Sequence, residues 1–301
     1  KEERPASLGE HVRPREGSGE RRSIGALFAT PPPGSSPRRA ILLSGRQEPK
    51  HRPGRPFLPR GRSARCARPP PGEMACPKLR VAVIGAGAAG LCAARHILAS
   101  PDTFADPVVF EASDHVGGTW VYTEETGEDA NGWPIHSSMY SDLRTNLPKE
   151  VMAFPDFPFD PSLPSFLHHS AVLAYLERYM GHFSIQDHIR FRWKVDSVKP
   201  VPKRTEGGPG GWDVTATLQA PTPTCQQLTE RFDAVMVCTG HYSSPFIPPI
   251  PGLDSFQGCL LHSHSFRHPE PFAGRSVVLV GAGPSGVDLA LLLFLWLLEW
   301  F

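Results

Sequence analysis

Two glycine-rich turns of the pattern G-x-G-x-x-G carry the clearest chemical signal in this 301-residue sequence. Each follows an apolar run and precedes a helix-like segment. Glycine there lets a strand reverse sharply into a helix while the backbone approaches a pyrophosphate, and free N–H groups at the helix N-terminus bind the phosphates. Two such turns predict two dinucleotide cofactors. The predicted cofactor-binding residues are Gly85, Gly87, Ala88, Ala89 and Gly90 in the first turn, and Gly281, Gly283, Ser285 and Gly286 in the second.

The first turn has the full context of a dinucleotide-binding unit. Residues 79–84 predict a buried parallel strand, residues 91–98 an Ala-rich helix, and residues 107–110 a second strand. Glu111 follows that second strand, 21 residues after the last glycine of the turn. This spacing is typical of a carboxylate that accepts hydrogen bonds from an adenosine ribose. The alternative is a plain strand-to-helix turn with a solvated glutamate.

The second turn has half of that context. A strand is predicted over residues 276–280, but the printed sequence stops before a residue that could bind the ribose. The apolar stretch 289–301, interrupted by Glu299, is predicted to continue the helix after the turn. It is shorter than the ~20 residues that a membrane span needs, so no transmembrane segment is expected.

Residues 1–73 differ in composition from the rest of the chain. They hold 16 Lys and Arg against 7 Asp and Glu, are rich in Pro and Gly, and show no hydrophobic periodicity. A disordered leader is therefore predicted, because the segment has too little apolar area to offset its ordering entropy. A transit peptide and nucleic-acid binding are the alternatives, but no nucleic-acid partner is expected because no aromatic platform accompanies the arginines. Met74 is the first methionine and a candidate start.

The cysteines and the body of the chain indicate an intracellular α/β protein. Six cysteines form no C-x-x-C pair, which favours reduced thiols. A helix with a Ser cap is predicted over 170–180, a long irregular loop over 133–166, and a buried strand over 232–238 that ends at Thr239 and Gly240. Residues 190–198 and 212–218 predict a small antiparallel β-hairpin.

The stretch between the two turns resembles the flavin-containing monooxygenase family. Phe256, Gly258, His262 and Phe266 fit that family's pattern F-x-G-x-x-x-H-x-x-x-[FY]. Three further segments are similar to the family's flavin-site segments: Gly117-Gly118-Thr119-Trp120, Leu143-Arg144-Thr145-Asn146 and Cys238-Thr239-Gly240. The resemblance covers about residues 78–291, and within the family it lies closer to the soluble, sulfide-oxygenating type.

The resemblance implies an α/β fold of two Rossmann-like domains with parallel sheets, the second nested in the first and truncated. It implies an FAD-binding domain over 74–250 that lacks its C-terminal return, and a linker motif with the start of an NADPH-binding domain over 251–301. It adds cofactor contacts from Gly118, Thr119, Trp120, Thr145, Asn146, Thr239 and Gly240. Asn146 is the candidate catalytic residue, and His262 is expected to be structural.

The chemistry implied by the resemblance belongs to the flavin. NADPH reduces FAD, O2 forms a C4a-hydroperoxyflavin, and a soft nitrogen or sulfur nucleophile takes one oxygen atom. The protein excludes water and holds the nicotinamide. The implied partners are a small nitrogen- or sulfur-containing substrate and O2, with a homodimer as a further expectation. The expected location is the cytoplasm, with association to the endoplasmic reticulum membrane as the alternative.

Three alternatives remain open on the sequence. Baeyer–Villiger monooxygenases share the layout but end the motif in Trp-Pro, where this chain has Phe266-Arg267. Flavin disulfide reductases need a C-x-x-x-x-C pair, and only Cys92 lies near the first helix. The third is a catalytically inactive FAD-binding fragment or interaction isoform, because the return segment is absent from the printed sequence.

Overall fold

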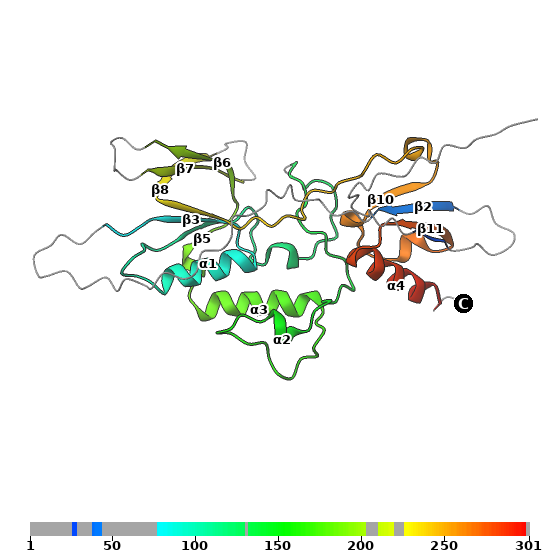
Figure 1. Ribbon diagram of the computed structural model, residues 1–301, viewed down its shortest axis with the longest axis horizontal. Coiled ribbons are helices and arrows are strands. Elements are labelled where there is room, and N and C mark those ends of the chain that lie inside the picture. Colours follow the sequence, from blue (N-terminus) through cyan, green and yellow to red (C-terminus); the bar gives the residue numbers. More distant parts are fainter. Residues whose placement is uncertain are drawn as a thin grey trace, which may run out of the picture.

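The computed structural model describes residues 26–28, 38–43, 77–129, 132–202, 210–219 and 226–298. The described elements form two α/β lobes side by side, one built around β3 and the other around β11 (Figure 1). The mixed α/β class and the parallel sheets that the sequence predicts are confirmed.

The first lobe has a four-stranded parallel sheet at its centre. Its strands, in spatial order, are β5 (Ile189–Arg190), β4 (Val108–Phe110), β3 (Val81–Ile84) and β9 (Ala234–Val237). Two helices, α1 (Ala88–Leu98) and α3 (His169–His182), lie together on one side of this sheet (Figure 1). They bury an apolar core with β3 and β4 that includes Leu91, Tyr175 and Tyr179. Parallel strands covered in this way are apolar along their length, as Val-Ala-Val-Ile of β3 is.

A three-stranded antiparallel sheet packs on the other side. Its strands, in spatial order, are β6 (Trp193–Val201), β7 (Gly211–Leu218) and β8 (Gln226–Phe232). The predicted hairpin corresponds to β6 and β7, and the prediction missed β8. The sequence Gln-Gln-Leu-Thr-Glu-Arg-Phe of β8 alternates only weakly in hydrophobicity, because most of this strand is exposed. Phe232 is buried and meets Phe110 edge to face, with ring centroids 6.1 Å apart.

The second lobe contains a mixed sheet and helix α4 (Pro284–Leu298). Its strands, in spatial order, are β1 (Ala26–Phe28), β11 (Arg275–Val280), β2 (Arg38–Leu43) and β10 (Cys259–His262). Strand β1 runs antiparallel to β11 at one edge of this sheet, whereas β2 runs parallel to both β10 and β11. No helix in the described part of the chain is both long and apolar enough to cross a membrane.

Strands β1 and β2 also correct the prediction of a disordered leader. Both lie within residues 1–73, and the remainder of that range lies outside the described residues. The composition averaged over residues 1–73 does not reveal the apolar run Ala40-Ile41-Leu42-Leu43. This run forms a strand because β10 and β11, more than 200 residues later in the chain, pair with it.

Short elements connect these layers. They are the four-residue helix α2 (Lys149–Met152) and the 3-10 turns η1 (Gly118–Trp120), η2 (Gln186–His188), η3 (Leu253–Ser255), η4 (Ser263–Ser265) and η5 (Glu270–Phe272). The predicted helix 170–180 is confirmed as α3, but its N-cap is His168 rather than Ser170: the His168 ring accepts a hydrogen bond from the Ser170 N–H. The loop predicted over 133–166 is interrupted only by α2 among its described residues.

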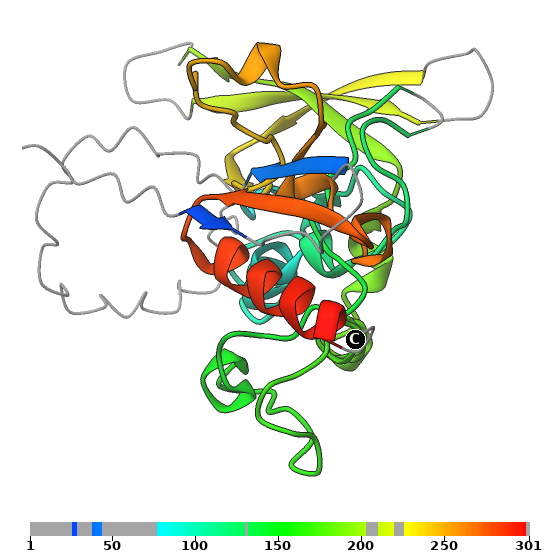
Figure 2. The same ribbon diagram turned by 90° about the vertical axis from the view of Figure 1, so that its right-hand side faces the viewer.

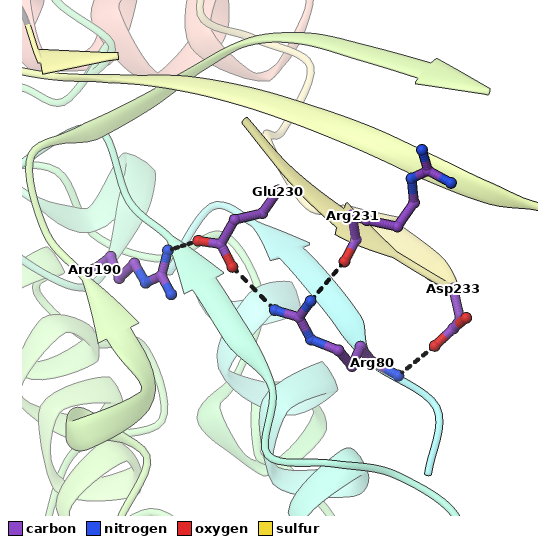
Figure 3. Close-up of polar contacts among 5 residues, drawn as sticks. All are labelled: Arg80, Arg190, Glu230, Arg231 and Asp233. Atoms are coloured by element: carbon purple, nitrogen blue, oxygen red, sulfur yellow. Dashed lines mark hydrogen bonds and ion pairs between the residues drawn. The ribbon is translucent and has the colours of Figure 1, made fainter. Parts of the chain in front are cut away.

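Glu230 on β8 ties the antiparallel sheet to the parallel sheet (Figure 3). Its carboxylate binds Arg80 at 3.0 Å and also pairs with Arg190 of β5. Arg80 donates further to the Arg231 carbonyl, and its backbone N–H donates to Asp233. Burial raises the pKa of Glu230, but the hydrogen bond and charge of Arg190, followed by those of Arg80, lower it more, so the net pKa lies below its ordinary value.

We expect Glu230→Gln to remove a pH-dependent part of the stability. A carboxyl whose pKa is lowered by folding stabilises the protein above its unfolded pKa, and that contribution disappears as the pH falls through the folded pKa. The variant should unfold about 1 kcal/mol more easily than the parent at pH 7, and the difference should vanish near pH 3. Urea unfolding at both pH values measures it, with the exposed Glu177→Gln as the control. An equal difference at pH 7 and pH 3 would contradict the role of the ion pairs.

Candidate functional site

The first glycine turn packs so closely that side chains cannot enter it. A Cβ on Gly90 would lie 1.8 Å from the Gly85 carbonyl oxygen. Gly85 has a φ of +100°, and a Cβ there would lie 2.6 Å from the Cys238 carbonyl oxygen. The turn therefore needs glycine at its first and third positions for the contact of α1 with the strands β3 and β9. Because these glycines carry no side chains, a ligand can approach the backbone at the N-terminus of α1, and this arrangement fits the phosphate of a dinucleotide.

The other positions of the first turn are less crowded. A Cβ on Gly87 would meet the Gly118 Cα at 3.6 Å, which is ordinary van der Waals contact. Gly87 is the N-cap of α1. Ala88 and Ala89 form the first turn of α1 and line an apolar groove of about 590 Å³ together with Cys92 and Met236. Contacts of Gly87, Ala88 and Ala89 with a cofactor stay a prediction.

Glu111 lies directly against the first turn. Its side chain is 8% exposed, and Oε2 accepts a hydrogen bond of 2.7 Å from the Ala86 N–H. Its Oε1 accepts hydrogen bonds from the N–H and the hydroxyl of Ser113, both at 2.8 Å. Glu111 directly follows strand β4, and it lies beside the first turn because the carboxyl ends of neighbouring parallel strands meet at one edge of the sheet. The carboxylate is thus held beside the predicted phosphate-binding turn, and its contact with a ribose stays a prediction.

Two further predicted segments meet the same turn. The Gly117 N–H donates to the Ala86 carbonyl at 3.1 Å, which holds η1 beside the turn. At the end of β9, the Cys238 N–H donates to the Ile84 carbonyl at 2.8 Å, and Thr239 and Gly240 follow as exposed residues. The structure thus brings the first turn, Glu111, η1 and the end of β9 together, although they are distant in sequence.

The remaining residues of these segments have other surroundings. The Thr119 carbonyl accepts a hydrogen bond from the Ser137 hydroxyl at 3.1 Å, and the Trp120 side chain packs against the apolar core beside α1. Thr145 is 7% exposed, and its Oγ1 accepts a hydrogen bond of 2.9 Å from the Leu167 N–H. Trp120 and Thr145 therefore have clear packing roles, and a cofactor contact by either stays a prediction.

Asn146 is the neighbour of the buried Thr145 and is itself exposed. The hydrogen bonds of Thr145 to Leu167 hold the backbone of this segment in place. Within the described ranges, no hydrogen bond joins the Asn146 amide to another protein group. A fixed backbone and an amide open to solvent suit a residue that contacts a ligand, and the catalytic role of Asn146 stays a prediction.

The second glycine turn joins β11 to α4. Gly281 has a φ of +120°, and the Val287 N–H donates to the Gly283 carbonyl at 3.1 Å as the helix begins. A Cβ on Gly283 would meet nothing within 4 Å. Ser285 is exposed, and Gly286 in the first turn of α4 is buried. This turn has the predicted strand–turn–helix geometry, and the cofactor contacts of its residues stay a prediction.

Arg267 is a buried residue that the sequence analysis did not assign to the site. Its side chain is 5% exposed, and it donates to four backbone carbonyls, those of His264, Phe266, Glu125 and Ser137, at 2.8 to 3.2 Å. Burial lowers the pKa of its guanidinium. Arg267 thereby connects the motif that runs from Phe256 to Phe266 to the first lobe. Arg267 directly follows the last motif position, but nothing in the local sequence indicates that its guanidinium would be buried among carbonyl groups.

A second connection between the lobes was also missed. The Tyr140 hydroxyl donates to Asp288 on α4 in a short hydrogen bond, and the Tyr140 ring meets Phe266 edge to face at 5.7 Å. Burial raises the pKa of the Asp288 carboxyl. His262, expected to be structural, accepts a hydrogen bond from the His264 N–H at 3.1 Å, and burial lowers its imidazole pKa. These contacts fix the start of α4 relative to the first lobe.

Fold and site together define an α/β protein with two strand–turn–helix units of the dinucleotide-binding type. Residues 78–294 match the family model described as Flavin-binding monooxygenase-like, and the chain belongs to this family. The resemblance inferred from the motifs is confirmed by this match.

Individual relatives agree with the family. The chain is 43% identical over 222 residues to Flavin-containing monooxygenase FMO GS-OX4 of Arabidopsis thaliana, which covers 70% of this chain and 45% of that protein. It is 36% identical over 212 residues to Senecionine N-oxygenase of Tyria jacobaeae, covering 70% of this chain and 44% of that protein. The solved S-allyl-L-cysteine S-oxygenase of Allium sativum is similar with a TM-score of 0.58 and 34% identity, over 73% of this chain and 49% of that one. The chain spans somewhat under half the length of these curated relatives.

We expect Gly90→Ala to destabilise the first lobe. Its methyl group would overlap the Gly85 carbonyl oxygen, and backbone atoms cannot move aside cheaply. The expected loss is about 2 to 4 kcal/mol of unfolding free energy, measured by urea unfolding. Gly181→Ala in α3 is the matched control, because nothing lies within 4 Å of its added Cβ and alanine favours the helix by about 0.5 to 1 kcal/mol. Equal stability of the two variants would show that the turn is not tightly packed.

Proposed function

We propose that the protein is a flavin monooxygenase that uses FAD and NADPH to transfer one oxygen atom from O2 to a small molecule with a soft sulfur or nitrogen atom. FAD is assigned to residues 74–250, at the first glycine turn. NADPH is assigned to the linker motif and second turn within 251–301. Because the chain spans under half of its curated relatives, this activity is proposed for the protein to which the described lobes belong.

The crowded first turn with Glu111 beside it is the observation that carries the proposal. Bare backbone at the N-terminus of α1 would hold the pyrophosphate, and the Glu111 carboxylate would accept the ribose hydroxyls. Bound FAD would supply the redox and oxygen chemistry, which no amino-acid side chain provides. The family match supports the choice of a flavin over other dinucleotides.

The protein's own task in this reaction is positioning and exclusion of water. Arg267 and the Tyr140–Asp288 pair connect the second lobe to the first, and in this proposal they would thereby position the nicotinamide relative to the flavin. Asn146 would donate a hydrogen bond from its amide into the flavin site and help to exclude water there. No acid–base triad is required, because the nucleophile belongs to the substrate.

Sulfur is the preferred substrate atom in this proposal. The relatives include a solved enzyme whose name gives it as an S-oxygenase and a curated one whose name gives it as an N-oxygenase. The sequence motifs resemble the soluble, sulfide-oxygenating type of the family more closely, so a thioether comes first as a test substrate and a tertiary amine second. Location in the cytoplasm and a homodimeric assembly are kept as predictions within this proposal.

We expect Glu111→Gln to weaken FAD binding about tenfold, because a neutral amide is a poorer acceptor for ribose hydroxyls than a carboxylate. Purified chain is titrated with FAD, and quenching of flavin fluorescence gives the dissociation constant. Glu177→Gln, an exposed exchange of the same kind on α3, is the control. An unchanged dissociation constant for the Glu111 variant would remove that residue from the site, and no flavin retention by the parent would contradict the assignment of FAD to this chain.

We expect Asn146→Ser to separate NADPH consumption from oxygenation. FAD content should be unchanged, while the ratio of sulfoxide formed to NADPH oxidised falls about two- to tenfold and hydrogen peroxide appears in its place. The matched control is Gln186→Ser, which shortens an exposed amide on η2. If the coupling ratio of the Asn146 variant equals that of the control, this residue does not contact the reacting centre.

A further inference from the structure

Strand β2 occupies the interior of the second sheet although it comes from the leader. It lies between β11 and β10 and runs parallel to both (Figure 2, β2 in blue beside β11 in orange). The register pairs Leu42 with Leu279 on one side and with Leu261 on the other. Leu42 is fully buried in the core of the second lobe with Leu289 of α4. The backbone of an interior strand forms hydrogen bonds along both edges, and this requires a partner strand on each side.

This strand lies outside the part of the chain that carries the family match. The match covers residues 78–294, which contain β10 and β11 but not β2. Within the described elements, β10 pairs with β2 alone. Strand β10 ends at His262, so it carries the middle of the family-like motif. The position of a motif strand therefore depends on a segment outside the residues of the family match.

The sequence of the segment suits a buried parallel strand. Residues 38–43 begin with two arginines and continue with Ala40-Ile41-Leu42-Leu43, an uncharged run without Pro or Gly. Such continuous apolar runs are typical of strands covered on both faces. Strand addition of this kind binds through main-chain hydrogen bonds and selects its partner through side-chain pockets.

We propose that residues 38–43 are a donor strand: a segment of the same chain that binds the slot between β10 and β11 and completes the second lobe. Along the chain, 33 residues lie between Leu43 and Pro77, which is long enough for the segment to reach the slot of its own molecule. The donor strand places β10 and the start of η4 at the edge of the sheet where the second glycine turn lies. This inference is independent of the proposed oxygenase activity.

Hydrogen exchange on the full chain tests the proposal first. Backbone amides of residues 38–43 should exchange at least about tenfold more slowly than in a synthetic peptide of the same sequence, because both strand edges are paired. Exchange at the rate of the free peptide would overturn the proposal.

A cysteine placed on β2 tests the register and the source of the strand. The register pairs Ala40 with Cys259, which is exposed and free. Ala40→Cys should therefore form a 40–259 cross-link under mild oxidation or with a short bifunctional thiol reagent, identified by peptide mass spectrometry in monomeric protein. Leu43→Cys is the control, because its register partner His262 lies three residues, about 10 Å, along β10 from Cys259. A cross-link found only between two chains would show that a second copy donates the strand, and equal cross-linking of both variants or of neither would refute the register.

Leu42→Asp tests whether the donor strand holds β10. A buried carboxylate at this position should expel β2, and the amides of residues 259–262 should then exchange at least tenfold faster, while those of β3 and β4 in the first lobe stay protected. Leu260→Asp on β10 itself is the matched control, because that side chain is 40% exposed. Unchanged exchange of residues 259–262 in the Leu42 variant would show that β2 is dispensable for that strand.

Discussion

The close contacts between backbone atoms at the first glycine turn determine how the segments of the first lobe meet. The Cβ that Gly90 lacks would sit inside the Gly85 carbonyl, and the Cβ that Gly85 lacks would overlap the carbonyl of Cys238. Three segments, the turn itself, η1 and the end of β9, can therefore meet at one point. Glu111 accepts the Ala86 N–H from the neighbouring strand and fills the remaining polar position. The turn, η1 and the end of β9 are thus placed by backbone contacts, and Glu111 adds a side-chain contact.

Local sequence was sufficient for the elements whose signals lie within a few residues. The strands β3, β4 and β11, the helices α1 and α4, and the position of Glu111 follow from apolar runs, glycine spacing and strand ends. The meeting of Gly117 and Cys238 with the first turn followed from the family resemblance and was not accessible from spacing. The cofactor contacts themselves, expected from both sources, stay predictions, since they depend on a ligand.

The features that escaped prediction depend on partners far away in sequence. Strand β2 is stable only where β10 and β11 flank it, and the composition of the leader concealed six suitable residues among many charged ones. Strand β8 carries few apolar residues because it is largely exposed. Arg267 and the pair Tyr140–Asp288 connect the lobes, and no local pattern marks a guanidinium that will be surrounded by carbonyl groups.

The contact of Arg267 between the lobes and the contact of Glu230 between the two sheets of the first lobe should respond differently to acid. The four acceptors of Arg267 are backbone carbonyls, which do not titrate, and a guanidinium keeps its charge at any pH at which a protein folds. The contact between the parallel and antiparallel sheets relies instead on a carboxylate held by Arg80 and Arg190. On acidification the contact between the two sheets should therefore weaken, while the hydrogen bonds of Arg267 to its four carbonyl acceptors persist.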